Sequence, residues 1–348
     1  MQRVSNPVNI DENKLYYQIG IRSHSKGIFY KKAETGKQIG NKKIFWVESN
    51  CLILNIVFAW EQAVAKTSQK EIGMVVSHRF PMYKVLNNSL DYIVDFFKTE
   101  KGRQVLQMAS PGGAGRNKTL NQKFFLNSKV YLPSLKEQLI ISRFIALIEN
   151  RIETQIKIIS DHTSLKEGIY NLMFKENHAE FKLKELANIV KGKQINNDQL
   201  LSNGFYYMMN GGTSPSGYLN SYNVLENTIS VSEGGNSCGY VQFNNSKFWS
   251  GGHCYTIQDV NSILVDNKYL YHYLKYKEKE LMNLRIGTGL PNIQKKDLEN
   301  FMISVPSLLI QRKNLALLEM LDKKKCILNK ELQCLERQKK YLLCNMFI

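Results

Sequence analysis

Two stretches of the chain carry apolar residues at alternating steps of four and three, which keeps one face of a long helix apolar. Each begins just after a Pro-Ser pair, at Pro133 and Pro306, and continues for some 40 residues without glycine or proline, Gly168 excepted. We expect two long helices, with each proline in a first turn, where an N–H is not needed. We call such an apolar row along a helix, the a/d positions of a coiled coil, its seam. The first seam comprises Ile148, Ile152, Gln155, Ile159, His162, Lys166, Ile169 and Met173. The second comprises Leu321, Lys325, Leu328, Leu332, Leu335, Lys339, Leu342 and Met346.

The two stretches are copies of one sequence. LPSLKEQLIISRFIALIENRIETQ and its continuation to NLMF align without a gap with VPSLLIQRKNLALLEMLDKKKCIL and its continuation to NMF. The offset of 173 residues pairs Pro133 with Pro306 and Gln138 with Gln311. Self-similarity at a fixed offset indicates a repeated architecture. The chain is therefore predicted to consist of two related halves.

Polar residues interrupt both seams, and Lys166 and Lys339 do so at equivalent places. A polar seam residue can fix the register of a coiled coil at some cost in stability. A lysine that extends from the edge of the seam into solvent is the alternative. His162, in the first seam, is expected to be a packed or half-exposed helix residue and not a ligand.

Two such helices, separated by a domain, can pair antiparallel and hold the globular parts at a fixed distance, as a ruler. Two separate helical hairpins that only brace their domains are the alternative. Either way, the predicted organisation is a first head at residues 1–131, a long helix at 132–177, a second head at 178–304 and a long helix at 305–348.

Both heads are predicted to mix strands, loops and a few helices, because short apolar runs alternate with glycine and asparagine clusters. These runs include KIFWV, MVVSHRF, NTISVSEG and HCYTI. The longest run, CLILNIVFAW at 51–60, is half the roughly 20 residues that span a bilayer and is expected to be a buried strand. The predicted fold class is α+β, with two mixed α/β domains separated by long helices that pair as an antiparallel coiled coil with a pseudo-two-fold repeat.

The net charge of +17 changes this picture, because it marks a surface that attracts polyanions, first nucleic acid and then anionic membranes. No signal peptide is recognised at the start of the sequence. The six cysteines show neither a CxxC pair nor the Cys/His spacing of a zinc module. We expect a reduced, cytoplasmic, metal-free protein in which all six cysteines have structural roles.

Candidate DNA-binding residues in the first head lie in three segments. The basic segment 22–43 can bind phosphates through charge alone, although a merely solvated basic face is an equal alternative. A strand end at 77–79 and the glycine-rich PGGAGRNK at 111–118 present groups suited to phosphates and base edges. The candidates are Lys31, Lys32, Lys37, Lys42, Lys43, Ser77, His78, Arg79, Arg116, Asn117 and Lys118.

The second head contains three glycine-rich phrases, NGGTSPSGY, EGGNSCGYV and LRIGTGLPNI. Glycine lets the backbone approach a ligand closely, but none of the phrases has the spacing of a nucleotide-binding loop. Ordinary tight turns remain the alternative for each phrase. The candidates here are Thr213, Ser214, Asn236, Ser237, Tyr240, Arg285 and Asn292.

These phrases, together with PSLKEQ and GMVVSHRFPMY, resemble the specificity subunits of type I restriction-modification systems. The resemblance covers nearly the whole chain in the order head, helix, head, helix. It departs where PSLLIQ replaces PSLKEQ, and where the first head begins without a counterpart of FKLKELANIVKGKQI at 181–195.

The resemblance implies two target recognition domains, each reading one half of a split site in double-stranded DNA. It also implies that two methyltransferase subunits dock on the two halves and that restriction and motor subunits join later. DNA methylation would then be performed by the partners, so S-adenosylmethionine, ATP and magnesium would belong to them and this chain would hold no cofactor.

The sequence shows no catalytic motif that would make the chain itself an enzyme. NPVN at 6–9 does not match the NPPY-like segment of an adenine methyltransferase, and phosphate-loop, helicase and hydrolase signatures are not found. Two alternatives stay open. One is a basic scaffold that binds DNA without sequence preference, and the other is a nuclease with acids scattered across the heads.

Overall fold

The computed structural model describes residues 1–112, 118–176, 178–287, 289 and 291–347. The chain forms two compact units. Unit 1 comprises Met1–Ile156 and Lys330–Ile348, and unit 2 comprises Lys157–Asn329. Each unit therefore contains one head and parts of both long helices, α5 (Leu135–Phe174) and α10 (Leu308–Asn345).

The helix α5 begins at Leu135, two residues after its proline. Ser134 caps the helix, because its Oγ accepts from the Glu137 N–H at 3.4 Å while the Ser134 N–H donates to Glu137 Oε2 at 2.9 Å. This reciprocal arrangement is a capping box. Pro133 therefore precedes the capping residue. The expectation that it lies in the first turn of the helix was wrong, because Ser134 stands between Pro133 and Leu135.

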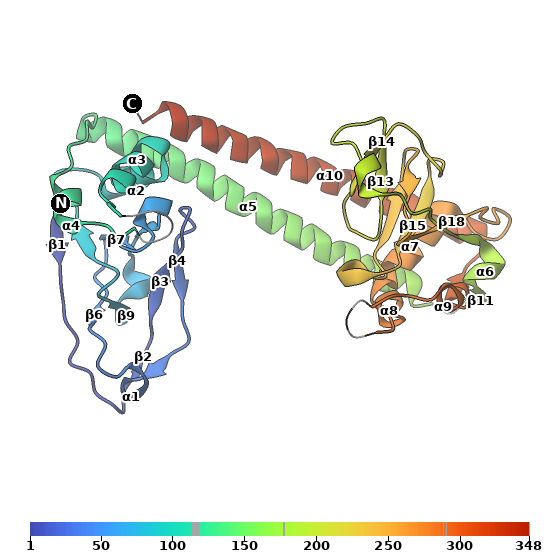
Figure 1. The fold of residues 1–348 in the computed structure, drawn as a ribbon, viewed down its shortest axis with the longest axis horizontal. Helices are drawn as coiled ribbons and strands as arrows, with labels where there is room; N and C mark the ends of the chain where they lie inside the picture. The colour runs from blue at the N-terminus through green and yellow to red at the C-terminus, as the bar shows by residue number, and fades with distance from the viewer. Residues whose placement is uncertain (113–117, 177, 288, 290, 348) are drawn as a thin grey trace. The chain divides into compact units, whose positions relative to one another are not determined.

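The seam positions are buried or half-buried in both helices, whereas residues between them are mostly exposed. In unit 1, the first part of α5 packs on the last part of α10, where Lys339 Nζ lies 2.7 Å from Glu149 Oε1. In unit 2, the last part of α5 packs on the first part of α10, where Lys166 pairs with Asp322. The helices are thus antiparallel (Figure 1), and both seam lysines pair with an acid on the facing helix. These pairs favour the register interpretation.

The head of unit 1 is built from short strands and helices. Its strands are β1 (Gln2–Val4), β2 (Leu15–Tyr16), β3 (Ile19–Ile21), β4 (Ile28–Tyr30), β5 (Glu34–Thr35), β6 (Ile44–Trp46), β7 (Leu52–Leu54), β8 (Val64–Lys66), β9 (Val75–Ser77) and β10 (Met82–Lys84). Its helices are α1 (Gly36–Ile39), η1 (Ala59–Glu61), η2 (Gln69–Glu71), α2 (Leu90–Lys98), α3 (Glu100–Met108) and α4 (Gln122–Asn127).

The head of unit 2 is of the same mixed kind. Its strands are β11 (Ala179–Lys182), β12 (Asn188–Lys191), β13 (Tyr206–Met209), β14 (Gly217–Leu219), β15 (Thr228–Ser232), β16 (Val241–Asn244), β17 (Trp249–Ser250), β18 (Cys254–Gln258) and β19 (Met302–Val305). Its helices are α6 (Leu183–Leu186), η3 (Asn197–Gln199), η4 (Gly235–Ser237), α7 (Asn267–Tyr276), α8 (Glu278–Asn283) and α9 (Lys295–Glu299).

The two heads share a four-stranded antiparallel sheet. Its order is β1-β10-β7-β8 in unit 1 and β12-β18-β15-β16 in unit 2. In each sheet a short 3-10 helix, η1 or η4, follows one inner strand, β7 or β15, and a longer helix, α2 or α7, follows the other inner strand, β10 or β18. The heads are therefore more alike in framework than their sequences indicate.

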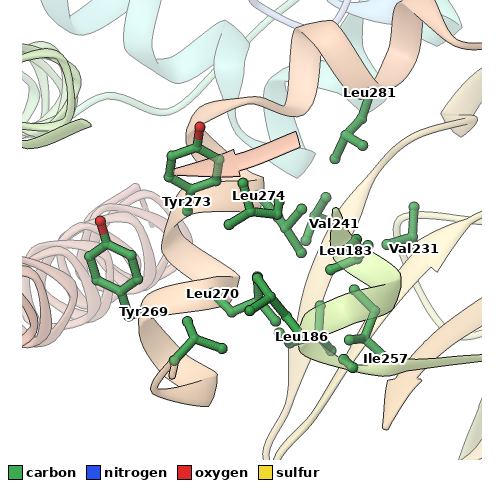
Figure 2. Packing of buried hydrophobic residues seen from close by; sticks show 14 of the residues in the cluster. Leu183, Leu186, Val231, Val241, Ile257, Tyr269, Leu270, Tyr273, Leu274 and Leu281 are labelled. Carbon is green, nitrogen blue, oxygen red and sulfur yellow. The ribbon is translucent and has the colours of Figure 1, made fainter. Parts of the chain in front are cut away.

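A buried apolar cluster holds the sheet of unit 2 against its helices. Figure 2 shows α7 presenting Leu270 and Leu274 toward the sheet. Tyr269 and Tyr273 lie on the other side of the helix, where each ring packs edge-on against Phe174 of α5. The members of the cluster, Val231, Val241 and Ile257 among them, are at most 8% exposed. Burial of a side chain of this size stabilises a fold by about 1.5–3 kcal/mol. This packing holds the sheet rigidly in place, and with it the ends of the strands that the glycine-rich loops connect.

Two sequence expectations need correction. The run at 51–60 forms a buried strand only over Leu52–Leu54, because the chain then turns at Asn55, whose side chain accepts from Val57 N. The cysteines divide into two groups: Cys51, Cys238 and Cys254 are buried, whereas Cys326, Cys334 and Cys344 are exposed on α10. The expectation of packing roles for all six was wrong for the exposed three.

Candidate nucleic-acid interface

In unit 1, several of the predicted residues meet where β6 and β9 pair. Ile44 is opposite Ser77, and the next residue, His78, donates its N–H to Lys43 O at 3.3 Å. This pairing brings Lys42 and Lys43 close to the turn at 77–80. Lys42, Lys43, His78 and Arg79 are exposed and Ser77 is half-buried. The arrangement offers several cationic groups and hydrogen-bond donors on one edge.

Main-chain hydrogen bonds link that edge to the segment around Lys118. Ile56 N donates to Arg79 O at 3.0 Å, and Leu120 N donates to Ile56 O at 2.8 Å. The Lys118 ammonium lies 5.3 Å from the ring centroid of Trp60, a cation–π distance. Residues 55–61, 77–80 and 118–120 thus form one group, which we call the loop cluster of unit 1. Arg116 and Asn117 lie outside the described residues.

Three other predicted lysines occupy a separate part of this head. Lys31 and Lys32 follow β4, and Lys37 lies in α1, which Thr35 caps through a reciprocal bond with Gln38. All three lysines are exposed. Their charge suits contact with phosphates.

In unit 2, glycine-rich loops from different parts of the sequence converge at one edge of the sheet. Ser232 Oγ donates to Gly211 O at 2.6 Å, His253 N donates to Asn210 Oδ1 at 3.0 Å, and Gly235 N donates to Pro291 O at 3.0 Å. We call residues 210–214, 232–237, 251–253, 285–287 and 291–292 the loop cluster of unit 2. The three phrases chosen from the sequence therefore belong to one surface.

Two glycines in this cluster are required by close approach of the chain. A Cβ at Gly211, where φ is +83°, would lie 3.0 Å from His253 O. A Cβ at Gly251 would lie 2.5 Å from Asn210 Oδ1. Side chains at these positions would separate the loops, so glycine here holds the cluster together.

Most predicted residues of the second head lie on this cluster. Thr213, Ser214, Asn236 and Arg285 are exposed, and Ser237 and Asn292 are half-buried. The exception is Tyr240, whose ring lies 4.0 Å from the Lys275 ammonium of α7 and so faces the helix.

The sequence reasoning missed Lys191, Glu233 and His253. Lys191 Nζ lies 2.6 Å from Glu233 Oε1, and His253 Nδ1 lies 3.9 Å from Glu233 Oε2. Burial and the Glu233 carboxylate raise the pKa of Tyr255, which therefore stays a hydroxyl and donates to Glu233 Oε1 at 3.1 Å. The signal in the sequence was an acid directly before Gly234-Gly235 in a strongly basic chain.

The described residues offer no obvious place for a metal ion, since no group of three or more His, Cys, Asp or Glu side chains among them is arranged to hold one. In the same described part of the chain, no helix combines the length and the apolar character needed to cross a bilayer. The chemistry that the loop clusters present is hydrogen bonding and charge.

Comparison with known proteins finds similarity in the region that contains this surface. Residues 175–337 match the family model described as the type I restriction modification DNA specificity domain. This part of the chain is thus similar to type I specificity subunits. The matched region contains the whole loop cluster of unit 2.

Individual relatives agree with this relationship. A protein of Mycoplasma pneumoniae named as a type I specificity subunit, S.MpnORF638P, is 34% identical over 35% of this chain and 32% of its own length. A protein of Mycoplasma genitalium named likewise, S.MgeORF438P, is 33% identical over 35% of this chain and 32% of its own length. These alignments span about a third of the specificity subunits that they match.

The fold of the entire chain is also found among specificity subunits. The crystal structure of the type I restriction-modification S subunit from M. genitalium superposes with a TM-score of 0.65, at 16% identity, over 99% of both chains. At this identity the likeness concerns the fold. It extends over nearly the whole length of both chains, including unit 1, which lies mostly outside the matched family region.

Proposed function

We propose that this chain is the sequence-recognition subunit of a type I restriction-modification complex and performs no chemistry itself. Each head binds one half of a split site in double-stranded DNA. Methyltransferase subunits dock on the chain, and restriction and motor subunits join them. S-adenosylmethionine, ATP and magnesium belong to those partners in this proposal, and the methyltransferase extrudes the adenine that it modifies.

One observation carries the proposal: the two heads have the same main-chain hydrogen bonds at their loop clusters but present different side chains there. Ile56 N donates to Arg79 O in unit 1, and Glu233 N donates to His253 O, at 2.9 Å, in unit 2. Leu120 N and Ile293 N donate to the carbonyls of Ile56 and Glu233 in the same way. An enzyme with one active site does not require two equivalent loop clusters. A protein that recognises two different half-sites does require them.

The test is co-expression with the methyltransferase encoded beside this chain, followed by mapping of methylated adenines in the host DNA. The expected result is a split motif that appears only when both proteins are present. Exchange of residues 178–304 for the head of another family member should change one half of that motif and leave the other half intact. A change in both halves would contradict one domain per half-site.

The same experiment, together with a cleavage assay on the purified chain, separates the competing functions. A basic scaffold would bind DNA without a motif, because phosphate contacts carry no sequence information. A nuclease would cut DNA as the purified chain with added magnesium. Either result would overturn the proposal, and lack of association with the methyltransferase would overturn it too.

A further inference from the structure

Glu233 has an unusual environment for an acid near a DNA-binding edge. It directly follows the buried strand β15, and its side chain is only 8% exposed. Oε1 accepts from the Lys191 ammonium at 2.6 Å and from the Tyr255 hydroxyl at 3.1 Å. Oε2 is buried and has no hydrogen-bond partner among the described residues. A buried carboxylate oxygen without a partner costs free energy, so a role beyond packing is indicated.

The side chains beside Glu233 reach solvent. Lys191 is 52% exposed and His253 is 64% exposed. The backbone of His253 is fixed on both sides, because its N–H donates to Asn210 Oδ1 and its carbonyl accepts from Glu233 N. The imidazole is therefore held at the surface of the loop cluster, with Nδ1 3.9 Å from the unpaired oxygen.

The equivalent place in unit 1 shows that the framework does not require this acid. Ile56 occupies the position of Glu233, and Arg79 occupies the position of His253, with the same main-chain hydrogen bond between them. The strand pairing places Ser5 where Lys191 stands, one residue beyond the Val4–Met82 pair as Lys191 is one beyond the Val190–Thr256 pair. The charged set is a property of the second head alone.

The charges of Lys191 and Glu233 favour contact with base edges over contact with phosphates. The Lys191 ammonium and the Glu233 carboxylate cancel, so the set has little attraction for the polyanionic backbone. It nevertheless presents donors and acceptors side by side, which suits the major-groove pattern of a base pair. A phosphate site would instead keep an uncompensated cation, as Lys42 and Lys43 do in unit 1.

We propose that Lys191 and His253 read base edges in the half-site bound by the second head, and that Glu233 is the residue that positions them. This inference rests on the proposed function. Glu233 fixes the lysine directly and provides a second oxygen that the imidazole N–H meets when DNA is bound. The carboxylate thereby acts through its neighbours and does not itself need to reach the groove.

The test uses the full chain with its methyltransferase subunits, after the split motif has been mapped. Affinity is measured for the cognate duplex and for duplexes with one substituted base pair in either half-site, at several salt concentrations. His253→Ala and Glu233→Gln should each reduce discrimination about tenfold in one half-site, because each removes or misplaces a contact with a base edge. Discrimination in the other half-site and the slope of affinity against salt should not change.

Controls separate a positioning role from a loss of structure. Lys184→Ala removes an exposed cation from α6 of the same head and should leave discrimination intact. Glu233→Gln combined with Lys191→Ala should lose less than the sum of the single losses, because residues that act as a unit are not additive. His253→Ala truncates an exposed side chain and keeps the test valid if Glu233→Gln misfolds.

Two results would overturn the inference. Unchanged discrimination in folded variants would show that these residues do not read bases. Equal weakening on all duplexes, with a salt slope reduced by about 0.9, would show a phosphate contact. Failure to find any motif with the wild-type complex would instead count against the proposed function, so the two failures are distinguishable.

Discussion

Gln311 makes in unit 2 the contacts that Gln138 makes in unit 1. Gln138 Nε2 donates to Pro133 O at 2.9 Å and its Oε1 accepts from Ser89 N at 2.9 Å. Gln311 Nε2 donates to Pro306 O at 2.8 Å and its Oε1 accepts from Asp266 N at 2.8 Å. Ser89 and Asp266 are the N-caps of α2 and α7. The repeated glutamine therefore joins each long helix to the equivalent helix of its head.

Replacement of this glutamine should destabilise its own unit. Gln311→Ala leaves the buried carbonyl of Pro306 and the half-buried main-chain groups of Leu264 and Asp266 without their partners, and each buried unsatisfied group costs about 1–3 kcal/mol. We expect the free energy of unfolding to fall by roughly 2–4 kcal/mol in urea titrations. Hydrogen exchange should increase in α7 first. Gln333→Ala, at an exposed position of the same helix, is the control and should change little.

The ion pair between Lys339 and Glu149 should contribute little to stability despite its place in the seam. Their side chains are 30% and 32% exposed, so solvent screens the attraction. A double-mutant cycle with Lys339→Met and Glu149→Gln should give a coupling free energy of about 0.5–1 kcal/mol that decreases in high salt. Lys295 and Glu299, which are 49% and 31% exposed and both lie in α9, provide the comparison cycle. A coupling of several kcal/mol would contradict this estimate.

Acid should weaken unit 2 through His272. Burial, assisted by the Lys166 ammonium, lowers the pKa of this imidazole to about 4, from the usual value near 6.5. Nε2 lies 3.8 Å from Asp322 Oδ2, which favours the Nε2–H tautomer, so Nδ1 accepts from the Tyr170 hydroxyl at 2.9 Å. Between pH 6.5 and 4 the unfolded chain binds a proton that the folded chain does not. Stability is therefore complete above pH 6.5 and falls as the pH drops toward 4, by at most about 3 kcal/mol.

Urea unfolding between pH 7.5 and 4.5 measures this dependence. His272→Asn should be less stable at neutral pH, because the hydrogen bond with Tyr170 is altered, but its stability should depend less on pH over this range. His78→Asn removes an exposed histidine and should keep the wild-type dependence. An unchanged slope in His272→Asn would show that other groups cause the acid sensitivity.

Changes in helix length should alter the spacer between the two half-sites if the long helices act as a ruler. Insertion of seven residues into α5 with a matching seven in α10 preserves the a/d seam. The mapped motif should then keep both halves and gain spacer base pairs. An insertion of two residues in each helix rotates the seam and should instead disrupt assembly. If the coiled coil is longer and the spacer is unchanged, the helices do not act as a ruler and only brace their domains.

The sequence by itself determined the parts of this protein that depend on local periodicity. The steps of four and three along 148–173 and 321–346 fix which side chains can be buried in a helix pair, and the 173-residue offset makes the halves equivalent. Glycine spacing identified loops that tolerate close approach, so the three phrases of the second head were found without the fold. The charge of +17 indicated the type of ligand.

Only the tertiary structure decided which distant residues share a surface. Nothing local in the sequence places Lys191 beside Glu233, because their contact follows from strands β12, β18 and β15 lying next to one another in the sheet. The likeness of the two heads was hidden for a similar reason. Main-chain hydrogen bonds such as those of Ile56 and Glu233 are independent of side-chain identity, so the framework can repeat while the sequence on its loops does not.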